Sequence, residues 1–151
     1  MHTMTIATEM NDRRPLLSTL WIFLVLNYLV ADVYALFFDP VLQKEATQER
    51  LSGQVGSIQI TQEFVLLTAI VLETAIVMVV LSRVLPYGAN RWCNIIVGLL
   101  QTAFAATSLI GSTVPDLFSI FFVVIEVATT VFIIWYAWTW PRPDAAAPAR
   151  R

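Results

Sequence analysis

The sequence predicts an all-α, polytopic membrane protein, built as a bundle of four transmembrane helices. Of its 151 residues, 58% are hydrophobic and 13% are charged, whereas about a quarter of the residues in a soluble domain are charged. The apolar residues gather in four runs, each about as long as the 20 residues that a helix needs to cross a bilayer. Polar segments with proline or glycine separate the runs, as expected for connections between helices.

The first run, 16–38, follows a polar tail at residues 1–15. A helix of this length covers about 30 Å at 1.5 Å per residue, which matches the hydrocarbon thickness of a membrane. A cleavable signal peptide is the alternative interpretation. The apolar core of a signal peptide usually has only about 7 to 15 residues, so we expect an uncleaved helix.

A polar loop after the first run predicts a short surface helix. Asp39 followed by Pro40 is typical of an N-cap with proline at the first helical position, and Gly53 is placed to end the helix. The three further membrane helices are expected at 64–84, 92–110 and 117–140, with Pro86-Tyr87-Gly88 and the turn at 111–115 as breakers. The transmembrane domain thus covers 16–140, and residues 141–151 form a disordered tail rich in proline and alanine.

The basic residues predict the topology of the bundle. If the helices alternate in direction, seven arginines lie on the side of the two termini, and only Lys44 and Arg50 lie opposite. Lysine and arginine are retained on the cytoplasmic side of membrane proteins. Both termini are therefore expected to be cytoplasmic. The seven are Arg13, Arg14, Arg83, Arg91, Arg142, Arg150 and Arg151.

Two similar phrases, Val71-Leu72-Glu73-Thr74-Ala75 and Val124-Ile125-Glu126-Val127-Ala128, each place one carboxylate inside an apolar run. Counted at 1.5 Å per residue, both glutamates lie roughly 14 Å from the outer ends of their helices, near the midplane. Asn27 and Gln101 reach a similar depth, and Asp32 lies nearer the outer surface. Each helix is therefore expected to contribute one polar side chain to a single layer.

The third helix shows which way its polar residues should face. Asn94, Gly98, Gln101, Ala105 and Ser108 are spaced four, three, four and three apart, which places them on one side of a helix. Small and polar residues favour close packing between membrane helices. We expect this seam to face the other helices.

The candidate binding or proton-titrating residues are therefore Glu73, Glu126, Asp32, Asn27 and Gln101. An ionisable group costs roughly 2.5 to 3.5 kcal/mol at the centre of a membrane helix, which suggests a function. One interpretation is binding or translocation of protons or a small cationic solute. The alternative is a structural or assembly role, in which neutral acids hydrogen-bond between helices and fix their packing. A lipid- or quinone-binding module is a third option.

Several classes of function are disfavoured by what the chain lacks. Cys93 is the only cysteine and His2 the only histidine, so one chain offers no disulfide, no Cys/His zinc site and no bis-histidine haem site. There is no nucleophile elbow and no phosphate-binding glycine loop. The net charge of −2 and the absence of a long basic run argue against a nucleic-acid partner. We expect no enzyme activity, cofactor or metal.

Four segments of the expected helices are distinctive: Leu20-Trp21-Ile22-Phe23 with Asn27-Tyr28 and Asp32, Leu81-Ser82-Arg83-Val84-Leu85, Asn90-Arg91-Trp92-Cys93-Asn94-Ile95-Ile96, and Ile133-Ile134-Trp135-Tyr136-Ala137-Trp138. These segments resemble a family of small bacterial four-helix membrane proteins that is a domain of unknown function. The resemblance covers about residues 16–140, and it implies the same fold and a bacterial inner-membrane location. It implies no activity and no residue role. The expected partners are the lipid bilayer, a proton or small cationic solute, and a second copy in a homo-oligomer.

Overall fold

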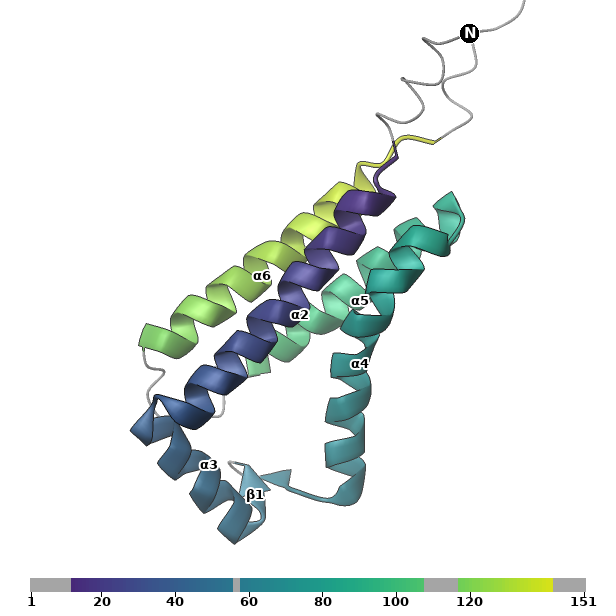
Figure 1. Cartoon of the computed structure of the whole chain (residues 1–151). Helices are drawn as coiled ribbons and strands as arrows, with labels where there is room; N and C mark the ends of the chain where they lie inside the picture. Colours follow the sequence, from purple (N-terminus) through teal and green to yellow (C-terminus); the bar gives the residue numbers. More distant parts are fainter. Residues whose placement is uncertain (1–11, 56–57, 108–116, 143–151) are drawn as a thin grey trace, which may run out of the picture.

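A computed structural model describes residues 12–55, 58–107 and 117–142 of the chain. In this part five helices and one two-stranded hairpin follow one another (Figure 1). They are α2 (Arg14–Phe37), α3 (Pro40–Ser52), β1 (Gln54–Val55), β2 (Ile58–Gln59), α4 (Gln62–Val84), α5 (Tyr87–Thr107) and α6 (Leu117–Trp138). The expected turn at 111–115, the end of the third expected helix and most of both tails lie outside the described residues.

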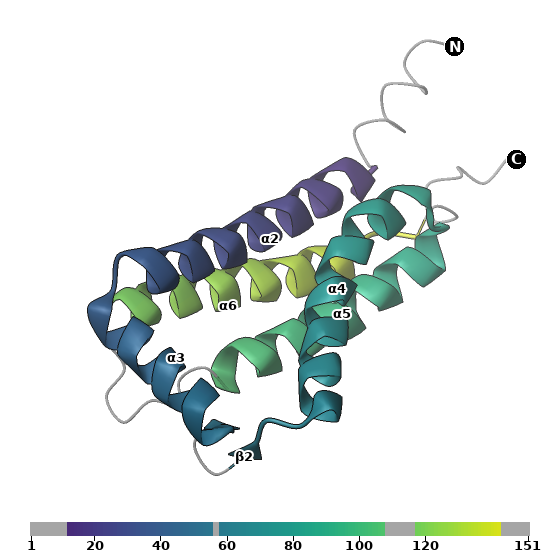
Figure 2. The ribbon, with the colours of Figure 1, turned by 60° about the horizontal axis from the view of Figure 1, so that its bottom comes forward.

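The four long helices form a closed ring of contacts in the order α2, α4, α5, α6 and back to α2. The start of α2, the turn between α4 and α5, and the end of α6 lie together (Figures 1 and 2). We call this the arginine end, because Arg13, Arg83, Arg91 and Arg142 all lie there. At the opposite end α3 and the hairpin connect α2 to α4, and we call this the α3 end.

Three of the helices, α2, α4 and α6, are long and apolar enough to cross a membrane. The remaining long helix, α5, carries its polar residues on the side that faces its neighbours. Asn90, Asn94 and Gln101 are fully buried, whereas Ile96 and Leu99 are exposed. Gly98 and Ala105 are buried too, so the predicted seam of α5 is confirmed up to Ser108, which lies outside the described residues.

Two details of the connections differ from the prediction. The third long helix begins at Tyr87 rather than at 92, because Pro86 ends α4 and its carbonyl then accepts the first hydrogen bond of α5, from Asn90 N at 2.9 Å. Gly88 was wrongly expected to break the helix. Glycine inside a helix costs only about 1 kcal/mol relative to alanine, and this is too little to interrupt a packed helix.

The surface helix α3 begins and ends where the sequence indicated. Asp39 accepts hydrogen bonds from the backbone N–H groups of Val41 and Leu42, at 2.8 and 3.1 Å. Gly53 closes the helix with φ of 67°, a conformation that favours glycine. The short antiparallel hairpin that follows was not predicted, because two-residue strands leave too short a pattern to recognise.

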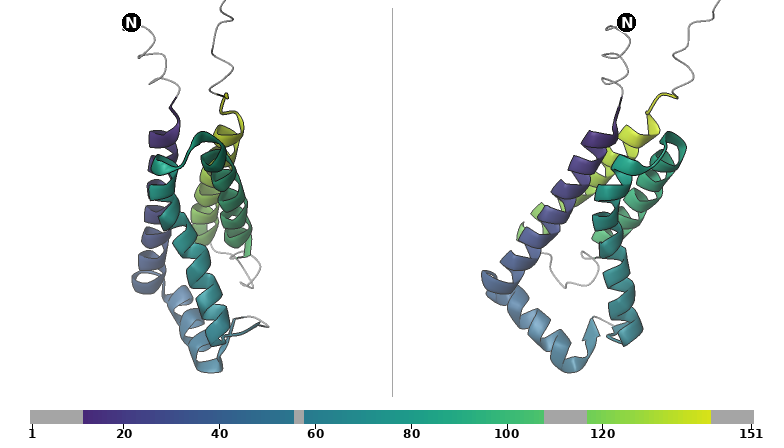
Figure 3. Two further views of the ribbon diagram at one scale, coloured as in Figure 1. Left: turned by 90° about the vertical axis from the view of Figure 1, so that its right-hand side faces the viewer. Right: turned by 45° about the vertical axis from the view of Figure 1, so that its right-hand side comes forward.

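The buried core lies towards the arginine end. On α2 the buried residues end at Leu24, and on α4 they begin at Ala75. The other halves of these two helices diverge towards the α3 end (Figures 1 and 3). The core residues are Leu17, Trp21, Leu24, Ala75, Met78, Ile95, Ile133, Ala137 and Trp140.

Candidate functional site

A buried hydrogen-bond network joins three helices near the arginine end. The indole Nε1 of Trp21 donates to Asn94 Oδ1 at 2.7 Å, and Ser82 Oγ donates to the same oxygen at 3.3 Å. Asn94 Nδ2 in turn donates to the Oδ1 of Asn90 at 2.6 Å and to its carbonyl at 2.8 Å. All four side chains are fully buried. Because their hydrogen bonds are made within the network, these groups fix how α2, α4 and α5 fit together.

Gln101 forms a second junction, further towards the α3 end. Its Nε2 donates to the carbonyl of Val71 at 2.6 Å and to Thr74 Oγ1 at 3.0 Å, and both of these residues belong to α4. Its Oε1 accepts from Tyr28 OH of α2 at 3.2 Å. Beside it, Thr102 Oγ1 contacts Thr130 Oγ1 of α6 at 2.8 Å. At this level, therefore, polar groups of all four long helices take part in hydrogen bonds between helices.

Glu126 lies where α6 packs on α2, and its side chain is only 7% exposed. It interacts electrostatically with Asp32 and Tyr28. The amide of Asn27 also lies beside this carboxylate, but its buried Nδ2 makes no hydrogen bond of good geometry with any described residue. Two acids and an unsatisfied amide donor are thus gathered between α2 and α6, with Asp32 itself exposed.

No described lysine or arginine neutralises this group of acids. The ion pair in the described part of the chain joins Arg14 to Asp12, with Nε and Oδ1 3.8 Å apart, at the arginine end. Nor do three or more histidine, cysteine or acidic side chains come together as metal ligands within the same residues. We call Glu126, Asp32 and Asn27 together the Glu126 group. Its carboxylates can accept protons, and its carboxylate and amide oxygens can bind a small cation.

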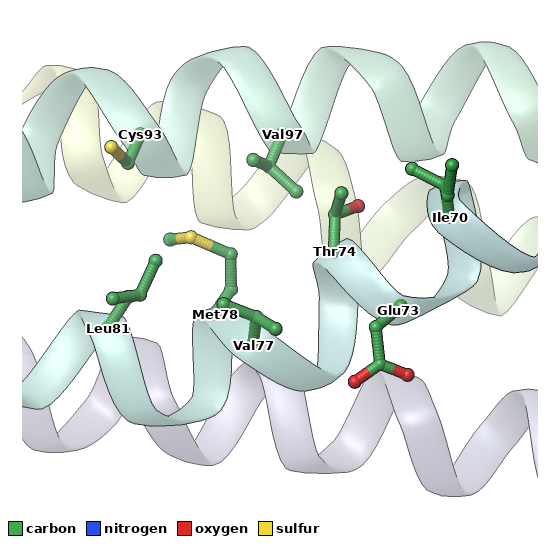
Figure 4. Close-up of a pocket in the computed structure, with 8 residues that line it drawn as sticks. All are labelled: Ile70, Glu73, Thr74, Val77, Met78, Leu81, Cys93 and Val97. Carbon is green, nitrogen blue, oxygen red and sulfur yellow. The ribbon is translucent and has the colours of Figure 1, made fainter.

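Glu73 lies apart from that group. It is exposed on α4 and lines a shallow groove of about 280 Å³ between α4 and α5. In Figure 4, Met78, Leu81, Cys93 and Val97 project into the space between the two helices, whereas the Glu73 carboxylate is directed away from α5. Glu73 is not among the groups that interact with Glu126.

Of the five predicted site residues, the structure brings Glu126, Asn27 and Asp32 together. Gln101 is linked to them through Tyr28, which is the neighbour of Asn27 in sequence. Sequence reasoning missed Trp21 and Tyr28 as polar partners. Leu17, Trp21, Leu24 and Tyr28 are spaced four, three and four residues apart, which places them on one face of α2. This spacing could have indicated that Trp21 and Tyr28 face the other helices.

Comparison with known proteins gives a family but no function. The sequence profile of a family of unknown function, DUF6326, matches residues 4–147. No curated protein and no solved structure matches the chain. The match extends over the surface helix and all four long helices, so the chain belongs to DUF6326.

Proposed function

We propose that this protein is a four-helix membrane protein that binds and translocates a proton or a small cation at the group formed by Glu126, Asp32 and Asn27. The observation that carries the proposal is the burial of Glu126 beside a second acid, with no described basic side chain paired to either. An uncompensated carboxylate in an apolar interior is costly, and it is relieved by a bound proton or cation.

The membrane location is supported by α5 as well as by the three apolar helices. With 21 residues, α5 is about 31 Å long at 1.5 Å per residue, enough to cross the hydrocarbon region. Its asparagines and its glutamine are buried within the bundle, and the large side chains Trp92, Ile96, Leu99 and Leu100 are exposed. A helix whose polar side faces its neighbours and whose apolar side faces outward is suited to a bilayer.

The orientation follows from the charges. The arginine end carries most of the basic residues, whereas Lys44 and Arg50 lie on α3. By the positive-inside rule the arginine end, and with it both termini, is cytoplasmic. We place the protein in a bacterial inner membrane, with the acidic group reached from the α3 end through the exposed Asp32.

The test measures pH-driven proton flux, and flux of Na⁺ or K⁺, in proteoliposomes that contain the purified protein. We expect Glu126→Gln to abolish the flux and Asp32→Asn to reduce it. Glu45→Gln, which changes an exposed acid on α3, is the matched control. Wild-type flux in Glu126→Gln would refute the proposal. Loss of flux in Glu73→Gln would instead favour the glutamate pair that the sequence suggested.

A structural role is the second candidate, and the network of Trp21, Ser82, Asn90 and Asn94 favours it. Fully satisfied buried polar groups can fix the register of helices without binding a ligand. In that case Glu126→Gln would lower the stability of the protein in detergent, and no flux would be found in the wild type.

A further inference from the structure

The arginine end has a basic surface whose arginines differ in what they bind. Arg13, Arg14, Arg83, Arg91 and Arg142 lie there, with Asp12 as the one acidic residue among the described positions. Such a surplus of positive charge suits an anionic partner. Which arginine is free to bind one depends on the contacts that each guanidinium already makes.

Three of these arginines already have polar partners. Arg13 donates to the carbonyl of Tyr136 and to Thr139 Oγ1, the latter at 2.7 Å. Arg83 Nε donates to Ser18 Oγ at 2.9 Å. Arg14 faces Asp12, although its own Nε makes no hydrogen bond.

Arg91 is held by an aromatic ring and not by hydrogen bonds to described residues. Its guanidinium carbon lies 5.2 Å from the ring centroid of Trp138 on α6. Its Nε is buried and has no hydrogen-bond partner among the described residues. A cation–π contact is an attraction between the charge and the ring and uses no hydrogen bond. The ring therefore fixes the position of the guanidinium, and its terminal Nη groups make no hydrogen bond with any residue that the structure describes. Arg91 is therefore oriented for a ligand that accepts hydrogen bonds.

The surroundings of Arg91 indicate where that ligand lies. Trp92 packs edge-on against Trp138, with ring centroids 6.4 Å apart. The two indoles are 55% and 57% exposed. Exposed tryptophans at the ends of membrane helices lie at the level of the lipid headgroups. A guanidinium fork matches the oxygens of a phosphate group.

We propose that Arg91, together with Trp92 and Trp138, binds the phosphate of an anionic phospholipid headgroup. The site lies between the start of α5 and the end of α6. The inference rests on the membrane location given under Proposed function, but it does not depend on the Glu126 group.

The experiment is native mass spectrometry of the full-length protein, released from micelles that contain equal amounts of phosphatidylglycerol and a neutral glycolipid, which has no phosphate. We expect the wild type to retain phosphatidylglycerol preferentially. Arg91→Gln should reduce that preference about tenfold, which is the scale of one charge-assisted hydrogen-bond pair. Arg91→Lys keeps the charge but loses the fork, and it should reduce the preference several-fold. Circular dichroism checks that each variant is folded.

Arg13→Gln is the matched control, because Arg13 also lies over an aromatic ring of α6, 4.3 Å from the centroid of Tyr136, but its Nη1 already donates two hydrogen bonds. An equal loss in Arg13→Gln, or none in Arg91→Gln, would overturn the proposal. So would full retention in Arg91→Lys, or displacement of the lipid by millimolar inorganic phosphate. Glu126→Gln should leave the lipid preference unchanged, so failure of the proton or cation site is seen separately.

Discussion

Replacing Asn94 with alanine should destabilise the bundle through the groups that it leaves behind. The substitution removes the acceptor of the Trp21 indole N–H and the donor to Asn90 Oδ1. A buried group left unsatisfied costs about 1 to 3 kcal/mol. Hydrogen bonds between membrane helices average about 0.6 kcal/mol by double-mutant cycles, since unfolded chains in a membrane also find partners. The substitution leaves two such groups, and the second figure favours the low end of the cost of each. We therefore expect the free energy of unfolding to fall by about 2 to 3 kcal/mol.

The assay is reversible unfolding by SDS in mixed micelles, followed by circular dichroism, for Asn94→Ala, Trp21→Phe and the double variant. Phenylalanine has no N–H, so Asn94→Ala should cost about 1 kcal/mol less in the Trp21→Phe background. Ile96→Ala, on the exposed side of the same helix, should change the stability little. If the two substitutions are additive within about 0.3 kcal/mol, the hydrogen bond does not stabilise the bundle and the reasoning is refuted.

Three other substitutions test separate contacts by the same unfolding assay. A Cβ added at Gly98 would lie 2.7 Å from Ile134 Cγ1. Gly98→Ala should therefore lower the free energy of unfolding by about 1 kcal/mol, because overpacking of about 1 to 3 kcal/mol exceeds the helix-propensity gain. In a chain that also carries Ile134→Ala, Gly98→Ala should have no such cost. Asp39→Ala removes the cap of α3 and should cost about 1 kcal/mol, with faster proteolysis of the loop as an independent sign. Gln101→Leu should cost about 1 to 2 kcal/mol, since it removes three hydrogen bonds; a stability gain would contradict this.

The sequence predicted the elements whose signals are local. Asp39, Pro40 and Gly53 mark α3 because capping depends on a few adjacent residues. The inward side of α5 was predictable because Asn94, Gly98 and Gln101 recur at helical spacing among apolar residues.

The orientation of Glu73 could not be predicted in this way. On α4 apolar residues surround the glutamate on every side, so no periodic pattern shows which face packs inward. The rotation of α4 is set instead by contacts between helices distant in sequence, such as Gln101 Nε2 with the carbonyl of Val71. For the same reason the pairing of Glu126 with α2, rather than with Glu73, becomes visible only in the folded bundle.

The position of the core towards the arginine end has a consequence for how the bundle opens. Local unfolding requires the least free energy where few side chains are buried. The divergent parts of α2 and α4, beyond Tyr28 and before Val71, should exchange their amide hydrogens faster than the parts that hold the core. The bundle is therefore expected to open from the α3 end, with the turn at Pro86 as the last part of α4 and α5 to separate.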